Sequence, residues 1–307
     1  MTANKDHICV CICTYKRPEL LNKLLKKLQN QITEGLFLYS IVVVDNDSAQ
    51  SARSTVDVLK NRPPIDIDYY VEPEQNIALA RNKAVENAKG NFIAFIDDDE
   101  VPTDCWLLDL YKACNKCKAD GVLGPVKPYF EKEPPQWIIR GKILERPSFS
   151  TGTILHWKDT RTGNVLLKKY IFDENNNIFD PLLGKCGGED KEFFKKNIKK
   201  GYVFVWCDEA AAYEFVPQKR LKRSYFLKRA LLRGRASCIR LKRKNFLSRT
   251  YFIIKAISAI LVYTLLLPFL LFFGQHVFMK YFIKDCHHIG SILGFLRIGS
   301  IASYDIE

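Results

Sequence analysis

The sequence predicts an α/β protein with a doubly wound, mostly parallel sheet, followed by a helical C-terminal region. Two observations support the sheet. Short apolar runs alternate with stretches of helical periodicity over the first 120 residues, and two of these runs end abruptly in carboxylates. A third observation supports the helical region, because a basic segment without acidic residues precedes a long apolar stretch near the C-terminus.

One buried strand organises the prediction. Phe92–Ile96 is an uninterrupted apolar run that stops at three adjacent aspartates, Asp97, Asp98 and Asp99. Open α/β sheets bind ligands where their strands end, and a hard cation together with substrate phosphates would relieve the repulsion between these carboxylates. This favours a site for Mg²⁺ or Mn²⁺ and a diphosphate. The alternative is an acidic turn that caps a helix starting within Asp99–Asp104.

The order of the elements indicates a parallel sheet. Strand patterns cover His7–Thr14, Ser40–Val44, Ile65–Val71 and Asn91–Ile96. Helical patterns begin at Pro18 and then cover about Gln50–Asn61, Asn76–Lys89 and Asp104–Lys118. A repeated strand–helix order of this kind is most simply satisfied by right-handed crossovers. The second strand also ends in an acid, Asp45, which could accept hydrogen bonds from a ribose or base, or could be a turn residue.

Two later stretches carry candidate acceptor-binding or catalytic residues. Gly124–Ile138 contains four prolines and three aromatic residues, which predicts a semi-rigid loop. Its aromatic rings, Trp137 among them, could stack on sugars or fix the loop to the core. Further on, Gly187 and Gly188 precede Glu189 and Asp190 at the start of a predicted helix. A carboxylate at such a junction is a candidate general base, although the pattern is also that of an ordinary helix start.

Composition limits the class of protein. With 47% hydrophobic and 26% charged residues, the 307-residue chain has enough apolar side chains for a packed core and is not expected to be disordered. The net charge of +13 belongs to one segment, since Lys219–Arg249 holds 13 basic residues and no acidic ones. We therefore expect no nucleic-acid partner at the sheet. The ten cysteines lack the spacing of a disulfide framework, which favours a cytosolic location.

The C-terminal region is predicted to associate with a membrane. Residues 1–218 form the expected α/β domain, and residues 219–307 form the helical region. Tyr251–Phe273 is long and apolar enough to cross a hydrocarbon core, but a hairpin kinked at Pro268 that enters one leaflet is favoured, and a buried helix of a soluble domain is the third possibility. The adjacent basic segment would bind an anionic membrane surface at its cytoplasmic face.

Taken together, the motifs resemble those of the family 2 glycosyltransferases, which have the GT-A fold. The shared stretches follow in the family's order over residues 7–225; they are I-C-T-Y-K-R-P, V-V-V-D-N, N-I-A-L-A-R-N, F-I-D-D-D-E-V-P, G-G-E-D and E-F-V-P-Q-K-R. The resemblance is nearest to bacterial enzymes of cell-surface polysaccharide synthesis. It implies transfer of a sugar, with inversion, from a nucleoside-diphosphate donor such as a UDP-sugar to a saccharide or a polyprenyl-diphosphate-linked acceptor.

The resemblance also implies roles for particular residues. The implied donor-binding residues are Thr14, Tyr15, Arg17, Asp45, Arg81, Asp97 and Asp98. Within this set Asp45 would read the base, Arg81 would lie near the base or phosphates, and Asp97 would lie near the ribose. Asp99, with Asp97, would bind the Mg²⁺ or Mn²⁺ that bridges the diphosphate.

On the acceptor side, Asp190 would be the general base and Glu189 would organise the acceptor, with Gly188 and Trp137 nearby. A base that takes the acceptor's hydroxyl proton and a Lewis acid that stabilises the leaving diphosphate are what an inverting transfer requires. The chain departs from the family where many relatives have a histidine before E-x-V-P, because the residue here is Tyr213. Arg220, Arg223 or another basic residue would then supply that positive charge.

Two other classes of function are weighed against this one. A sugar-phosphate nucleotidyltransferase would need a glycine-rich loop after the first strand, and T-Y-K-R-P contains no glycine. A non-enzymatic protein that binds anionic lipid or nucleic acid would rest on Lys219–Arg249 alone. The glycosyltransferase is the favoured interpretation.

Overall fold

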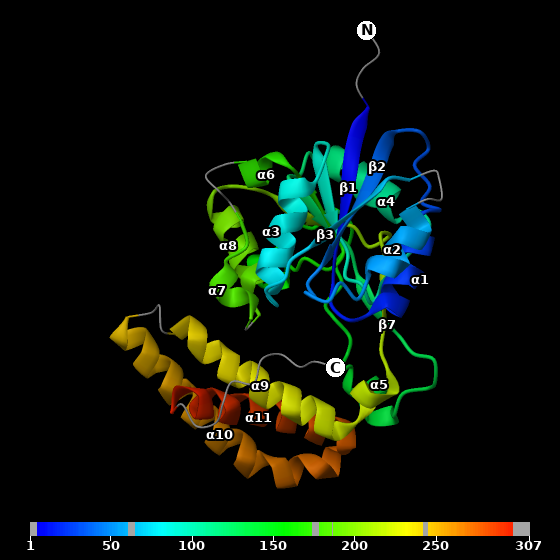
Figure 1. Ribbon diagram of the computed structural model, residues 1–307. Helices are drawn as coiled ribbons and strands as arrows, with labels where there is room; N and C mark the ends of the chain where they lie inside the picture. The colour runs from blue at the N-terminus through cyan, green and yellow to red at the C-terminus, as the bar shows by residue number, and fades with distance from the viewer. Residues whose placement is uncertain (1–4, 61–64, 174–177, 186, 242–244, 297–307) are drawn as a thin grey trace. The chain divides into compact units, whose positions relative to one another are not determined.

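The computed structural model of the chain describes residues 5–60, 65–173, 178–185, 187–241 and 245–296 (Figure 1). By internal packing the chain forms two compact units. The first comprises Met1–Pro128 and Arg146–Phe215, and the second comprises Tyr129–Glu145 and Val216–Glu307. The first unit contains both carboxylate-ended strands and the glycine–carboxylate junction.

A seven-stranded, mostly parallel sheet forms the centre of the first unit, in the order β3-β2-β1-β4-β8-β6-β9. These strands are β1 (Asp6–Thr14), β2 (Phe37–Asp45), β3 (Ile67–Val71), β4 (Phe92–Phe95), β6 (Gly121–Leu123), β8 (Val165–Lys168) and β9 (Phe204–Trp206). Only β8 runs antiparallel to its neighbours in this sheet, β4 and β6. The register pairs Thr14 with Asp45 and Cys11 with Phe95, so β1, β2 and β4 end at one edge. The predicted parallel sheet is confirmed.

Helices cover both faces of this sheet because the side chains of β1 alternate in direction (Figure 1). Ile8, Val10 and Ile12 pack on one face with helices α1 (Pro18–Leu28), α2 (Arg53–Lys60) and α4 (Trp106–Cys117). Cys9 and Cys11 pack on the other face with α3 (Ile77–Asn87), α6 (Tyr170–Asp173) and α8 (Glu189–Lys199). The eight cysteines that the structure describes are all free thiols.

A buried asparagine joins several connections of the first unit. Asn164, which has a left-handed backbone with φ of 59°, lies immediately before β8 and has no exposed surface. Its amide donates to the carbonyls of Pro125 at 2.9 Å and Ala210 at 2.7 Å, and its oxygen accepts from the Trp106 indole at 2.7 Å. Two of these bonds satisfy backbone carbonyls and the third satisfies the buried indole N–H.

The structure corrects two predictions about irregular segments. Glu100–Pro102 is strand β5, which joins β10 (Ala212–Phe215) and β7 (Val126–Tyr129) in a second sheet, and α4 begins only at Trp106. The acidic-cap alternative is therefore wrong, because backbone pairing with β10 holds the residues after Asp99 extended. The predicted loop Gly124–Ile138 contains β7 and the start of α5 (Gln136–Gly141), since its apolar residues find partners in sheet and helix. The remaining short elements are η1 (Trp157–Asp159), α7 (Pro181–Gly184), η2 (Gln218–Leu221) and η3 (Leu271–Phe273).

The second unit is built on three long helices, α9 (Arg223–Leu241), α10 (Phe246–Leu270) and α11 (Gln275–Phe295). Helix α11 packs against both α9 and α10. The contact with α9 is close, because a Cβ added at Gly234 would lie 2.0 Å from the carbonyl oxygen of His287, and one at Gly290 would lie 2.2 Å from that of Leu231. Small residues thus let the two backbones touch.

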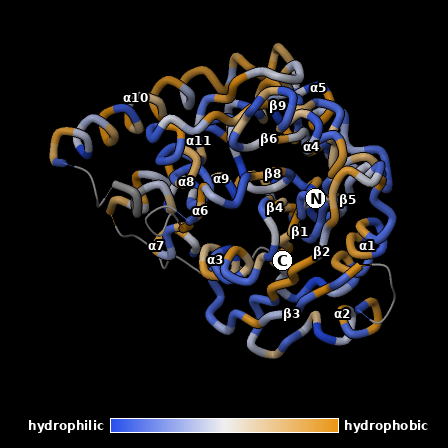
Figure 2. The backbone as a smooth tube through the Cα atoms, turned by 90° about the horizontal axis from the view of Figure 1, so that it is seen from above, coloured by the Kyte–Doolittle hydropathy of each residue, from blue (hydrophilic) through white to orange (hydrophobic). Residues whose placement is uncertain are grey.

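Helices α10 and α11 form a hairpin that turns at Gly274, where φ is 103°. Phe246–Phe273 is the one segment in the described part of the chain that is long and apolar enough to cross a membrane, and 6% of its apolar window is buried (Figure 2). A buried core helix would instead be covered on most sides, so that alternative is wrong. Pro268 lies inside α10 rather than at the turn.

Candidate active site

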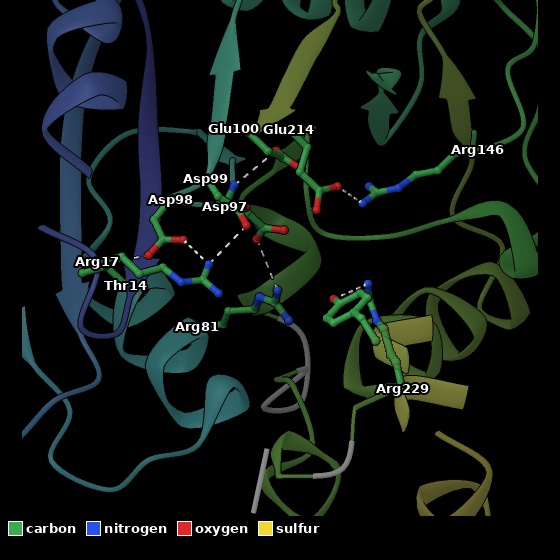
Figure 3. Close-up of polar contacts among 11 residues, drawn as sticks. Thr14, Arg17, Arg81, Asp97, Asp98, Asp99, Glu100, Arg146, Glu214 and Arg229 are labelled. Carbon is green, nitrogen blue, oxygen red and sulfur yellow. Dashed lines mark hydrogen bonds and ion pairs between the residues drawn. The ribbon is translucent and has the colours of Figure 1, made fainter. Parts of the chain in front are cut away.

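The acid run follows β4 at the sheet edge where β1 and β2 also end (Figure 3). The Thr14 hydroxyl donates to Asp98 Oδ2 at 2.7 Å, and Arg17 donates to Asp98 Oδ1 at 3.0 Å and to Asp99 Oδ2 at 3.2 Å. Three of the predicted donor-binding residues therefore hold one another. Asp98 is turned inward and is 5% exposed, whereas the side chain of Asp97 is 48% exposed and free to meet a ligand.

Arg81 connects the acid run to the glycine–carboxylate junction. It lies on α3, is buried, and forms ion pairs with Glu189 through Nη1 and with Asp97 through Nη2, the latter at 3.7 Å. Burial alone would lower the pKa of Arg81, but Glu189 and Asp97 outweigh it and raise that pKa. The charged guanidinium of Arg81 thus connects α3 with the acid run and with Glu189, which lies 108 residues after Arg81 in the sequence.

The glycine pair fixes the start of α8. Gly187 and Gly188 have φ angles of 78° and 100°, a left-handed conformation that a side chain would strain. Glu189 then points into the protein, where it is 5% exposed, and its Oε2 is buried without a hydrogen-bond partner among described residues. The backbone N–H of Lys191 donates to Asp190 Oδ1 at 2.7 Å, and the carboxyl group of Asp190 remains partly exposed. Asp190 can therefore reach a bound molecule, as a general base must.

Negative charge accumulates beyond Asp99. Glu100 is 1% exposed and accepts a hydrogen bond from the Asp97 N–H at 3.3 Å, while Glu214 pairs with Arg146. Burial, followed by the charges of Asp98, Asp97 and Glu214, raises the pKa of Asp99 to about 7. Burial likewise raises the pKa of Glu100. A cation bound beside these carboxylates would reverse both shifts.

The donor chemistry of this cluster fits Mg²⁺ or Mn²⁺, which bind carboxylate oxygens and substrate phosphates. Within residues 5–296, apart from the short stretches that the structure does not describe, no group of three or more histidine, cysteine, aspartate or glutamate side chains is arranged to hold a metal alone. The fit is thus to an ion that Asp99 and Asp97 would share with a ligand.

Other predicted site residues lie in less accessible places. Asp45 has no exposed surface, and its carboxylate accepts hydrogen bonds from the N–H groups of Asp47 at 3.1 Å and Ala52 at 2.8 Å and from the hydroxyl of Tyr69 at 2.8 Å. It shapes the turn after β2, and its contact with a base stays a prediction. Tyr15 is half-buried after β1, with Lys16 Nζ 5.1 Å from its ring centroid.

Trp137 lies in the second unit, 8% exposed, with its ring edge-to-face against Phe226 at 5.4 Å. This is the packing role that was the alternative for the aromatic segment, so Trp137 is not among the residues we propose to bind a sugar. Tyr213 is 41% exposed on β10. Arg220 and Arg223 belong to the second unit.

Sequence reasoning missed several residues around the acid run. Glu214 opens the E-F-V-P-Q-K-R motif, but Arg146 lies in no motif, and nothing in the sequence indicated the ion pair that they form across 68 residues. The backbone at Gly163 lies against the side chains of Asp97 and Glu100. A Cβ added at Gly163 would be 2.9 Å from a carboxylate oxygen of each. The Thr162-Gly163-Asn164 triplet before a strand was the only available signal for this approach.

The fold and the site define a GT-A enzyme: a doubly wound sheet whose strands end in clustered carboxylates facing a second carboxylate pair at a helix start. The chain belongs to glycosyl transferase family 2, because that family's model matches residues 9–187. The family found is that of the favoured interpretation, not of the nucleotidyltransferase or binding-protein alternatives.

Individual comparisons agree with this family. The chain is 35% identical over 232 residues to the succinoglycan biosynthesis protein ExoM of Rhizobium meliloti, covering 74% of this chain and 73% of that protein. It is 30% identical over 95 residues to the GalNAc(5)-diNAcBac-PP-undecaprenol beta-1,3-glucosyltransferase of Campylobacter jejuni, covering 30% and 29% of the two chains. Among solved structures, S. aureus TarS 1–349 in complex with UDP matches with a TM-score of 0.52 at 18% identity, over 98% of this chain and 94% of that one. The last similarity concerns the fold alone.

Proposed function

We propose that this glycosyltransferase moves a sugar, with inversion, from a nucleoside-diphosphate donor to a saccharide or polyprenyl-diphosphate-linked acceptor in polysaccharide synthesis. A UDP-sugar is the proposed donor, since the TarS structure that this fold matches is a complex with UDP. The proposed setting follows from the names of the relatives, which refer to succinoglycan biosynthesis and to an undecaprenol-linked glycan.

One observation carries the proposal: Arg81 bridges Asp97 at the end of β4 and Glu189 at the start of α8. This places an acidic cluster suited to a metal–diphosphate beside a helix start bearing a partly exposed carboxylate. Asp190 would take the proton of the acceptor hydroxyl as that oxygen attacks the anomeric carbon. Arg81 would hold Glu189 ionised and oriented, which keeps the acceptor side of the site in place.

The proposed cofactor is Mg²⁺ or Mn²⁺, held by Asp99 and Asp97. When bound, the ion would supply positive charge to the leaving diphosphate. Thr14, Tyr15 and Arg17 would line the nucleotide side, with Asp98 fixing Thr14 and Arg17 through the hydrogen bonds described above.

Membrane association is the second part of the proposal. Most exposed side chains of α10 are apolar, with Lys255, Ser258 and Thr264 as polar exceptions, and α9 before it carries basic residues without acidic ones. We infer attachment to the cytoplasmic face of a membrane with anionic lipids, where an acceptor with a lipid tail would be available.

The test is a comparison of Asp99→Asn with Asp190→Asn in the full chain. Binding of UDP is measured with and without Mn²⁺, and sugar transfer or donor hydrolysis is followed for a set of UDP-sugars. Asp99→Asn should abolish the metal-dependent part of UDP binding. Asp190→Asn should leave UDP binding unchanged and lower transfer by roughly 10²–10⁴-fold, the usual contribution of a general base.

Asp104→Asn is the matched control, because Asp104 forms an exposed ion pair with Lys27 and should leave both measurements unchanged. Equal loss of UDP binding in the Asp99 and Asp190 variants would contradict the division into donor and acceptor sides.

A further inference from the structure

Arg161 is a cation near the acid run that forms no ion pair with a described residue. It lies half-buried between Thr160 and Thr162, which are each 2% exposed. Across the described residues of the first unit, no ion pair or hydrogen bond of the Arg161 side chain is formed. Burying a charge without a partner is costly, so a ligand that supplies the opposite charge would be favoured here.

The segment around Arg161 lies between the middle of α8 and the acid run. At one end, η1 packs against α8, and Lys195 of α8 lies 5.4 Å over the ring of Trp157. At the other end, Gly163 lies against Asp97 and Glu100, as its 2.9 Å Cβ distances show. Arg161 lies between these two contacts in the sequence.

Charged residues on several sides act on Arg161. Burial and the charge of Arg146 lower the pKa of Arg161 to about 10, while Glu100, Asp190 and Asp159 act in the opposite direction. Arg146 forms an ion pair with Glu214. Arg146 thus has an ion-pair partner, whereas Arg161 forms no ion pair with a described residue.

The side of the site decides which substrate would be bound. Figure 3 shows Thr14, Arg17 and Asp98 on one side of the acid run and Arg146 with Glu214 on the other. The first side is the proposed nucleotide side. The segment that carries Arg161 packs through η1 against α8, and the first turn of α8 holds Asp190, the proposed base for the acceptor hydroxyl, so Arg161 belongs to the acceptor side.

We propose that Arg161 binds an oxyanion of the acceptor, either the carboxylate of an acidic sugar or the phosphate that links a sugar to lipid. This inference rests on the proposed function, since it assumes that a sugar acceptor approaches Asp190. A guanidinium can bind a carboxylate or a phosphate through two parallel hydrogen bonds, which makes it suited to either group.

The experiment compares charged probes with their neutral counterparts on the full chain saturated with UDP and Mn²⁺. One pair is methyl β-D-glucuronide and methyl β-D-glucoside; the other is glucose joined through diphosphate to a short isoprenoid and the corresponding isoprenyl glucoside. We expect at least one charged probe to bind tenfold or more tightly than its neutral counterpart. The pair that shows the preference identifies the oxyanion as a carboxylate or a phosphate.

Arg161→Gln should reduce that preference to less than twofold without changing the affinity for UDP, and Arg161→Lys should keep most of it. Lys158→Gln is the matched control, because it removes an exposed cation of the same segment, 5.6 Å from the Trp157 ring. Thermal unfolding of each variant verifies that it is folded.

The outcomes separate this inference from the proposed function. Wild-type protein that binds UDP but binds all probes without regard to charge would overturn the inference and leave the function standing. A tenfold loss of UDP affinity in Arg161→Gln would also overturn it, since Arg161 would then serve the donor. Failure of the wild type to bind UDP would overturn the proposed function and this inference with it.

Discussion

Replacing Arg81 with methionine tests the buried connection between α3, β4 and α8. The substitution keeps the volume of the side chain but leaves Glu189 without its counter-ion in a site that is 5% exposed. Glu189 Oε2 has no partner in the described protein even with Arg81 present. The variant therefore contains a buried carboxylate that nothing compensates.

The expected cost is large. Breaking a buried ion pair by removing one partner lowers the free energy of unfolding by about 3–5 kcal/mol. For a unit of this size each kcal/mol corresponds to about 2–4 °C in Tm, so the melting temperature should fall by roughly 6–20 °C. Asp97 contributes little to this loss, because its side chain is 48% exposed and keeps its water.

The double variant Arg81→Met/Glu189→Gln provides the decisive measurement. Removing the stranded charge should recover about 1–3 kcal/mol relative to Arg81→Met, the range for directly interacting residues. Thermal unfolding of the four proteins completes the cycle. Equal stability of the single Arg81 variant and the double variant would refute the reasoning, because the stranded carboxylate would then cost nothing.

The pH dependence gives an independent check with a defined sign. Burial raises the pKa of Glu189 in the wild type against the opposing effect of Arg81, and loss of Arg81 raises it further. The folded state then binds a proton more readily than the unfolded state. The deficit of Arg81→Met should therefore be largest at neutral pH and shrink as the pH falls through the folded-state pKa. Lys112→Met, which removes an ion pair with Glu34 that is about half exposed, should change stability by about 0.5 kcal/mol or less at any pH.

Three further predictions concern other parts of the chain. Asn164→Asp would direct a carboxylate at two buried carbonyls, and it should lower the free energy of unfolding by about 3 kcal/mol or abolish folding, measured by thermal unfolding. Gly234→Val would force a side chain into the backbone of α11, where the Cβ position is 2.0 Å from the His287 oxygen. This overpacking should lower the free energy of unfolding of the second unit by about 1–3 kcal/mol or more, measured by thermal unfolding. Leu261→Glu/Leu265→Glu should move the protein from the membrane fraction to the soluble fraction in sedimentation of lysates, because both leucines are exposed on α10.

Each of these has a control of the same chemical type. Asn30→Asp changes an exposed asparagine, Leu232→Val alters an exposed position on α9, and Leu38→Glu places a charge on the surface of the first unit. All three should behave as wild type. An Asn164 or Gly234 variant with wild-type stability, or a doubly charged α10 that still sediments with membranes, would contradict the corresponding argument.

The sheet and the acid run were predictable from sequence because their signals are local. A run such as Phe92–Ile96 must be buried by its own composition, and the alternation of strands and helices restricts how the runs can pair. Because β1, β2 and β4 end at the same edge of the sheet, the residues that follow Thr14, Asp45 and Ile96 lie close together. Neither step depends on knowing the partner of any individual residue.

The remaining features depend on contacts between distant residues. The antiparallel direction of β8 and the capture of Arg146 by Glu214 are decided by tertiary pairing, which leaves no periodic pattern in the sequence. The same holds for Asp45, which has the position of a ligand-binding residue but whose carboxylate is occupied by Tyr69 and two backbone N–H groups. Whether a carboxylate at a strand end faces inward or outward is set by such partners, and the residue type alone does not reveal it.

The hairpin of α10 and α11 limits how the protein could lie at the membrane proposed for it. The Thr264 hydroxyl donates to Asp285 Oδ2 at 3.2 Å, which holds the two helices side by side beyond the turn at Gly274. Lys280 and Lys284 are exposed on the returning helix, and Lys280 is the nearer to the turn, so a hairpin that entered hydrocarbon turn-first would carry this charge with it. A hairpin that lies along the surface of one leaflet, with both lysines among the headgroups, avoids that cost.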